Sequence, residues 1–176
     1  VRFHMPGHKG KVVCDYQNNL LPFDLTELKI TDNLYAPELN GGIRQAFDYA
    51  KTIYGTVNTV FSAGGATLCL QVAIMSIARK YGTKRIICDR RCHKSVINAL
   101  ILCDIEPVWI DVEKLTEIPE ASVMIITSTD YYGRICDVKH ISNMCRERNI
   151  TLICDNAHGA HLAYYDNGNL HPYNNG

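Results

Sequence analysis

Apolar residues recur along this chain at two spacings, one typical of helices and one typical of buried strands. From about Gly42 they follow a helical repeat that ends at Gly55, and the same repeat predicts helices over residues 66–81, 94–103 and 138–148. Short runs that are apolar at nearly every position predict strands over residues 58–61, 84–88, 107–110, 123–127 and 151–154.

The order of these elements predicts the fold class. Helices and strands alternate in units of about 25 to 30 residues, which is typical of βαβ crossovers and a mainly parallel sheet. Strands such as 123–127 are apolar throughout, as expected when helices cover both faces of the sheet. We therefore predict an α/β fold with three layers, αβα. Residues 1–35 contain several Pro and Gly breakers and are expected to be irregular, and residues 167–176 are expected to form a loop.

Composition narrows the classes of function. The 18 basic and 18 acidic residues balance, so charge gives no reason to expect a nucleic-acid or membrane partner. No apolar run reaches the length of a membrane span, and the first residues lack the apolar segment of a signal peptide. The eight cysteines include no Cys-x-x-Cys pair and lie mostly in apolar runs, which favours buried thiols over a zinc site. We expect a cytoplasmic protein.

One candidate for binding a phosphate is the turn Ser62–Thr67, between a predicted strand and a predicted helix. Its glycines allow a sharp turn, and the helix start offers free N–H groups and a positive dipole end. Thr67 could add a hydroxyl. Glycine turns before helices are common, however, and this one lacks the Lys-Ser/Thr ending of a P-loop.

Three other strand ends carry polar side chains, each with two interpretations. His93 either belongs to a charged loop that caps a helix or offers its ring to a planar ligand. Asp155 either caps a turn or binds a ligand. With His158 and His161 it also has the spacing of metal ligands, although Gly159 argues against a stable helix there. The loop 127–133 either contacts substrate or is a turn closed by its glycine.

Taken together, these segments resemble one family. The bacterial ornithine/lysine/arginine decarboxylases are enzymes dependent on pyridoxal 5'-phosphate (PLP) with the aspartate-aminotransferase fold type. Their motifs are similar, in order, to five segments of this chain: Arg2–Gly10, Asp32–Pro37, Gly42–Ala46, Cys92–Ser95 and Asp155–His161. The resemblance covers residues 1 to about 162. It implies an irregular segment over 1–35 and part of a PLP-binding large domain over 36–176, incomplete at its C-terminal end.

The resemblance also implies roles for individual residues. His93 would stack on one face of the pyridine ring and Ala157 would pack on the other. Asp155 would pair with the protonated ring nitrogen, which makes PLP a sink for the electrons that decarboxylation leaves on Cα. His93 and Asp155 would therefore be the catalytic residues. The full set expected to bind the cofactor is Gly65, Ala66, Thr67, His93, Asp155, Ala157 and His158.

Several positions depart from the family pattern. Asn156 stands where the family often has Glu, Ala66 where a hydroxyl residue is common, and Thr129 where Pro is frequent. No lysine follows Lys139, so the Schiff-base lysine, which the family carries in a Ser-x-His-Lys motif after the Asp155 segment, is absent. The resemblance therefore indicates an N-terminal fragment that is inactive alone.

The function expected from the resemblance is decarboxylation of a basic amino acid, namely ornithine, lysine or arginine. The expected partners are this small-molecule substrate and further copies of the same chain in a homo-oligomer. Which of the three is used remains open. The alternatives are a non-catalytic remnant or interaction module of the same fold, another PLP reaction such as aldol cleavage, and a metal-dependent hydrolase using Asp155, His158 and His161.

The fold type also implies a strand order. Two strands beyond this chain would separate the strand 58–61 from the other four. We therefore expect 58–61 to lack a ladder partner and the strand 123–127 to have an open edge.

Overall fold

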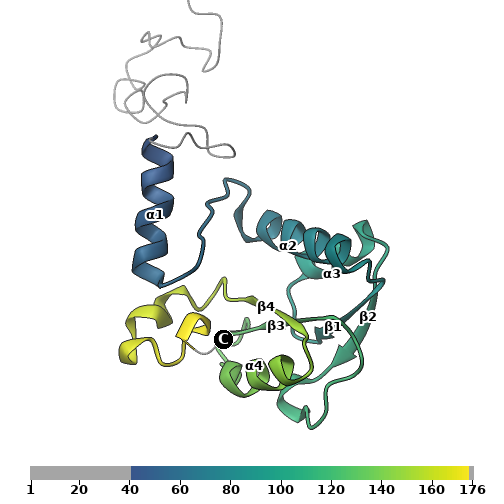
Figure 1. Cartoon of the computed structure of the whole chain (residues 1–176). Helices are drawn as coiled ribbons and strands as arrows, with labels where there is room; N and C mark the ends of the chain where they lie inside the picture. Colours follow the sequence, from purple (N-terminus) through teal and green to yellow (C-terminus); the bar gives the residue numbers. More distant parts are fainter. Residues whose placement is uncertain (1–40, 175–176) are drawn as a thin grey trace, which may run out of the picture. The chain divides into compact units, whose positions relative to one another are not determined.

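The computed structural model describes residues 41–174 (Figure 1). The chain divides into two units, one up to Phe61 and one from Ser62, and each is described by itself. The irregular segment expected over 1–35 lies outside the described residues, as do the motifs Arg2–Gly10 and Asp32–Pro37.

The described part of the first unit is a helix and the residues that follow it. Helix α1 spans Gly42–Tyr54 and ends, as predicted, at Gly55, which adopts the left-handed conformation with φ 63°. The Phe61 ring meets Phe47 edge-on, with 5.0 Å between centroids. The strand predicted over 58–61 is not formed. A strand requires a hydrogen-bonded neighbour, and the described residues of this unit offer none.

The second unit is built on a parallel sheet of four strands, β1 (Arg85–Asp89), β2 (Glu106–Ile110), β3 (Val123–Thr127) and β4 (Thr151–Asp155). The order is β2-β1-β3-β4, and every pairing is parallel. The α/β prediction is confirmed, and each strand lies within one or two residues of its predicted position.

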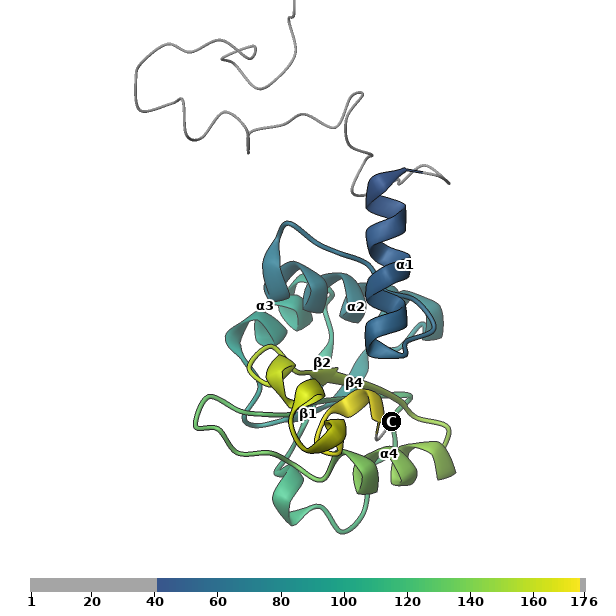
Figure 2. The same cartoon turned by 90° about the vertical axis from the view of Figure 1, so that its left-hand side faces the viewer.

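Helices cover both faces of this sheet, so the three-layer prediction is also confirmed (Figures 1 and 2). Helices α2 (Gly65–Tyr81) and α3 (Lys94–Leu102) pack on one face, and α4 (Val138–Glu147) packs on the other. Neighbouring strand residues alternate between two cores because side chains of a strand point to opposite faces. The core under α2 and α3 contains Ile86, Cys88, Val123 and Ile125, and the core under α4 contains Ile87, Met124 and Ile126.

The expected position of the open edge is wrong. Strand β3 pairs with β1 on one side and, from Val123↔Thr151 to Thr127↔Asp155, with β4 on the other. The outer edge on this side belongs to β4, whose first four residues are only half-buried. The expectation was drawn from the strand order of the fold type and omitted β4 beside β3, whereas the sheet of the described residues ends at β4.

After β4 the chain forms short 3₁₀ turns, of which the last two fall at least partly within the loop predicted over 167–176. They span Ala160–Tyr164, Asp166–Gly168 and Pro172–Asn174. Over residues 41–174, no helix combines the length and apolarity needed to cross a membrane.

Candidate functional site

The candidate residues of the second unit gather at the carboxyl edge of the sheet, where parallel strands deliver their following loops. β1 leads to His93, and β3 leads to the loop 127–133. β4 ends in Asp155 itself. The hydroxyl groups of Tyr81 and Thr151 lie 2.8 Å apart, so α2 ends beside the amino end of β4. The start of α2 therefore lies toward the carboxyl edge.

The start of α2 has the features of an anion site. Gly65 has φ +66°, a conformation that glycine adopts without strain, and this lets the chain turn into the helix. The N-cap residue is Gly64, so no side chain caps the helix. Gly65, Ala66 and Thr67 are all exposed. The first N–H groups of α2 therefore remain available to a phosphate.

His93 caps α3, as the simpler of its two interpretations predicted. Its Nδ1 accepts a hydrogen bond from the backbone N–H of Ser95 at 3.2 Å and lies 2.8 Å from the Ser95 hydroxyl. These contacts fix the ring while His93 remains exposed. Capping leaves the ring faces accessible, so the cap and a stacking role are compatible. Stacking stays a prediction.

Asp155 is 7% exposed and is held at the end of β4. Its Oδ1 accepts the N–H of Ala157 at 3.1 Å, and its carbonyl accepts the N–H of Ser128 at 2.9 Å. Within residues 41–174, Oδ2 makes no hydrogen bond or ion pair. The carboxylate is thus oriented by one oxygen and can offer the other to a cationic N–H group.

The charge of Asp155, at the end of β4, acts on Cys92 in the loop after β1. Burial, then the charge of Asp89 and, to a smaller extent, that of Asp155 raise the pKa of the Cys92 thiol to about 11. Cys92 directly precedes His93 in the chain. Ala157 and His158, which follow Asp155, are exposed.

The loop 127–133 is a closed turn. Asp130 Oδ1 accepts the N–H groups of Tyr132 and Arg134 at 2.9 and 3.0 Å. Burial raises the pKa of Asp130, but these two hydrogen bonds, together with the charges of Arg134 and Arg91, bring it below its ordinary value. The exposed ring of Tyr131 meets His158 edge-on at 6.4 Å. No sequence pattern predicts this contact, since the two residues follow different strands.

Thr129 in this loop has φ +67°, a conformation that is strained for a β-branched residue. Proline, frequent here in the family, could not adopt it, because its ring holds φ near −65°. Thr129→Gly should relieve the strain, whereas Thr116→Gly in another loop, where φ is not positive, should not. We expect the free energy of unfolding to differ between the two variants by about 1–2 kcal/mol in favour of Thr129→Gly. Urea denaturation measures it. Because Thr129 is buried and Thr116 is exposed, equal stabilities would show that the strain does not exceed the packing that the Thr129 side chain contributes.

The charged loop that leads to His93 is partly buried around Arg91. Arg91 Nη1 lies 2.6 Å from Glu113, and its Nε lies 3.5 Å from the fully buried Asp89. Burial raises the pKa of Asp89, and the Arg91 charge opposes that shift. The ion pairs tie β1 to the segment after β2, which is a structural role that the sequence pattern did not predict.

The metal hypothesis gains no support from the geometry. In the described part of the chain, no three His, Cys, Asp or Glu side chains are grouped as metal ligands. Asp155, His158 and His161 therefore form no such group. As Gly159 suggested, no α-helix follows, and His161 lies in the 3₁₀ turn Ala160–Tyr164.

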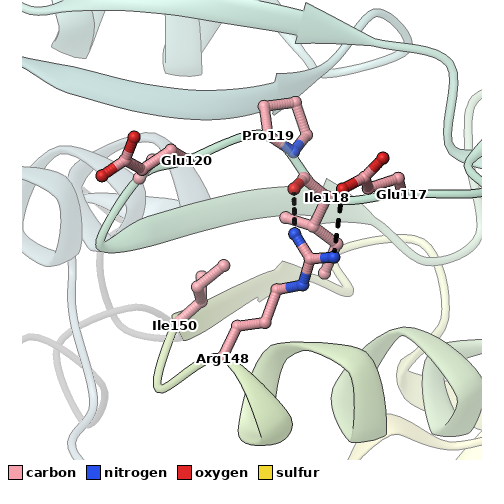
Figure 3. A pocket seen from close by; sticks show the side chains of 7 residues that line it. Glu117, Ile118, Pro119, Glu120, Arg148 and Ile150 are labelled. Carbon is pink, nitrogen blue, oxygen red and sulfur yellow. Dashed lines mark hydrogen bonds and ion pairs between the residues drawn. The ribbon is translucent and has the colours of Figure 1, made fainter.

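A separate hollow of about 460 Å³ lies at the opposite, amino edge of the sheet (Figure 3). There Arg148 donates from Nη1 to the Ile118 carbonyl at 2.6 Å and from Nη2 to Glu117 at 3.4 Å. These bonds hold the segment before β3 against the end of α4. Since the hollow precedes β3 and β4, it is distinct from the site at Asp155.

Comparison with known proteins shows the family to which this chain belongs. A family model described as "Orn/Lys/Arg decarboxylase, major domain" matches residues 1–116. Arginine decarboxylase of Bacillus subtilis (strain 168) is 30% identical over 190 residues, covering 94% of this chain and 38% of that protein. The chain thus spans well under half the length of this relative.

Solved structures share the fold. An aromatic amino acid beta-eliminating lyase/threonine aldolase from Exiguobacterium sp. 255-15 matches with a TM-score of 0.66 and 18% identity, over 86% of this chain and 47% of that one. SPT with a PLP internal aldimine matches with a TM-score of 0.50 and 16% identity, over 73% of this chain and 35% of that one. The family model covers well over half of the residues, and this chain belongs to the Orn/Lys/Arg decarboxylase family.

Proposed function

We propose that this chain forms the cofactor-binding part of a PLP-dependent decarboxylase that converts a basic amino acid, arginine, lysine or ornithine, to the corresponding amine and CO₂. The observation that carries the proposal is the buried Asp155 carboxylate, which has one oxygen oriented and the other available. Membership of the family and the arginine decarboxylase relative support it.

The residues present fit the cofactor. When bound, PLP supplies the sink for the electron pair that loss of CO₂ leaves on the substrate Cα. Asp155 would keep a proton on the pyridine nitrogen, because a fixed carboxylate stabilises an adjacent N–H⁺ group. The Ala157 N–H holds Oδ1 in place, so Oδ2 is the oxygen suited to that contact.

The other site residues would orient the cofactor. The free N–H groups of Gly65, Ala66 and Thr67 would bind the phosphate, with the Thr67 hydroxyl as a further donor. The capped ring of His93 would stack on the pyridine, and Ala157 and His158 would lie on the other side. We also propose that the protein works in the cytoplasm as a homo-oligomer, without a nucleic-acid or membrane partner, and that its product enters polyamine biosynthesis.

The test is a decarboxylation assay of the full-length gene product with PLP and arginine, lysine or ornithine, measuring CO₂ and amine. We expect PLP-dependent turnover of at least one of them. Turnover of none would contradict the proposal. Aldol products, or hydrolysis that depends on added metal, would favour the corresponding alternative.

Residues 1–176 alone should not bind PLP covalently at one site. No lysine follows Lys139, and Lys94 beside His93 does not match the family's Schiff-base motif. After incubation with PLP, borohydride reduction and peptide mapping should show scattered, substoichiometric labelling. The full-length gene product is the control and should be labelled at one lysine. Stoichiometric, saturable labelling of Lys94 in residues 1–176 would contradict this expectation.

A further inference from the structure

The side chain next to Asp155 is held by a residue from the end of the described chain. The amide of Asn156 lies 2.8 Å from Nε2 of His171, with Nδ2 as the nearest amide atom. His171 is 2% exposed, and its Nδ1 accepts the backbone N–H of Tyr173 at 3.3 Å. The pair joins the loop after β4 to the last 3₁₀ turn of the unit.

Hydrogen-bond chemistry decides how this pair is arranged. Burial lowers the pKa of His171, which favours the neutral ring. A neutral imidazole accepts at one nitrogen only, so it cannot accept from both Tyr173 and the Asn156 amide. Turning the amide by 180° removes the conflict, because Nε2–H then donates to the amide oxygen.

The other end of the same amide is packed in a confined space. The amide atom at this end is Oδ1 in the structure and Nδ2 after the turn. Its position and the Thr129 hydroxyl are both buried, and both would crowd a Cβ placed on Gly159. The N–H of Gly159 also donates to the Asn156 carbonyl at 3.0 Å. The amide is therefore enclosed by His171, Thr129 and Gly159, which belong to three different segments.

We propose that Asn156 and His171 form a positioning pair that fixes the loop Asp155–Gly159, so that the neighbours of Asn156 in the chain, Asp155 and Ala157, are held in place for the cofactor. The proposal rests on the function proposed above. Asn156 stands where the family often has Glu, and His171 gives that substitution a partner. Neither residue belongs to the set expected to bind the cofactor, and the pair acts through Asp155 and Ala157.

The test is a double-mutant cycle in the full-length gene product, with Asn156→Ala, His171→Phe and both together. The readouts are the Kd of PLP and the circular dichroism of the bound cofactor, which reports its orientation. Because one hydrogen bond joins the pair, each single variant should bind PLP about tenfold more weakly, and the double variant no more weakly than either single one. All three should change the cofactor's dichroism in the same way.

Controls separate this role from general destabilisation. His171→Gln, which can still donate to the amide, should bind PLP to within about threefold of the wild type. It also serves as the test if His171→Phe does not fold. Asn98→Ala and His140→Ala, at exposed positions on α3 and α4, should leave binding and dichroism unchanged.

The outcomes distinguish the pair from the proposed function. If the wild type binds PLP but the variants bind it equally well, or the two losses add in the double variant, the pair is overturned and the function stands. If His171→Gln binds as weakly as His171→Phe, the pair is likewise overturned. A wild-type protein that binds no PLP overturns the function and the pair with it.

Discussion

Asp155→Ala in the full-length gene product is expected to lower the rate of decarboxylation by about a hundred- to a thousandfold. The loss corresponds to roughly 3–4 kcal/mol, the usual contribution of a well-placed electrostatic group in an active site. Asp155 is buried and oriented by the Ala157 N–H, so its charge is poorly screened by water. Steady-state kinetics on the PLP-saturated protein measure the effect.

Asp155→Asn is the matched variant for this experiment. Its side-chain oxygen can still accept from the Ala157 N–H, but it carries no charge to stabilise a ring N–H⁺. We expect a loss of activity close to that of Asp155→Ala with a better preserved fold. Glu120→Gln, at an exposed position on the amino edge, should change nothing. If Asp155→Ala keeps more than about a tenth of the wild-type rate, Asp155 does not act on the pyridine nitrogen.

Gly159→Ala is expected to have the next largest effect. The added Cβ would overlap the Asn156 amide and lie 2.6 Å from the Thr129 hydroxyl. Gly159 has φ −110°, so the cost arises from crowding rather than from the backbone conformation. Overpacking of this kind should lower the free energy of unfolding by about 1–3 kcal/mol. Since the displaced residues flank Asp155, binding of PLP should also weaken.

Gly42→Ala is the control, because a Cβ there meets no atom of residues 41–174 within 4 Å. It should leave the free energy of unfolding nearly unchanged. Urea denaturation and PLP titration of both variants provide the comparison. Equal stability of the two would show that the contacts around Gly159 yield easily and do not hold the loop.

The sequence predicted the elements of the second unit well because their signals are local. Apolar runs marked all four strands, and glycines marked the ends of α1 and α2 at Gly55 and Gly82. The strand order was harder. The expected open edge at 123–127 is wrong, and the edge belongs to β4. Strand pairing depends on which surfaces remain to be covered after folding. Residues 58–61 form no strand, which agrees with the expectation that they would lack a ladder partner, because β propensity does not form a strand without a neighbour.

The candidate site shows the same contrast between features with a local sequence signal and contacts between distant segments. Asp155 and the start of α2 can be proposed from the sequence because each lies at the end or the start of a regular element. Sequence analysis does not predict two contacts, that of Asn156 with His171 and that of Tyr131 with His158. Each joins residues from different loops, so no regular spacing in the sequence indicates it. Asn156 was noted only as a departure from the family pattern. Its partner explains how the chain accommodates that departure.

The central claim, that PLP binds at the carboxyl edge of this sheet with Asp155 on its ring nitrogen, is tested most directly by a crystal structure of the full-length gene product with PLP. We predict a carboxylate oxygen of Asp155 at about 2.7–2.9 Å from the pyridine nitrogen, and the phosphate at the start of α2. PLP bound elsewhere, or bound here with Asp155 out of hydrogen-bond reach of the nitrogen, would contradict the claim.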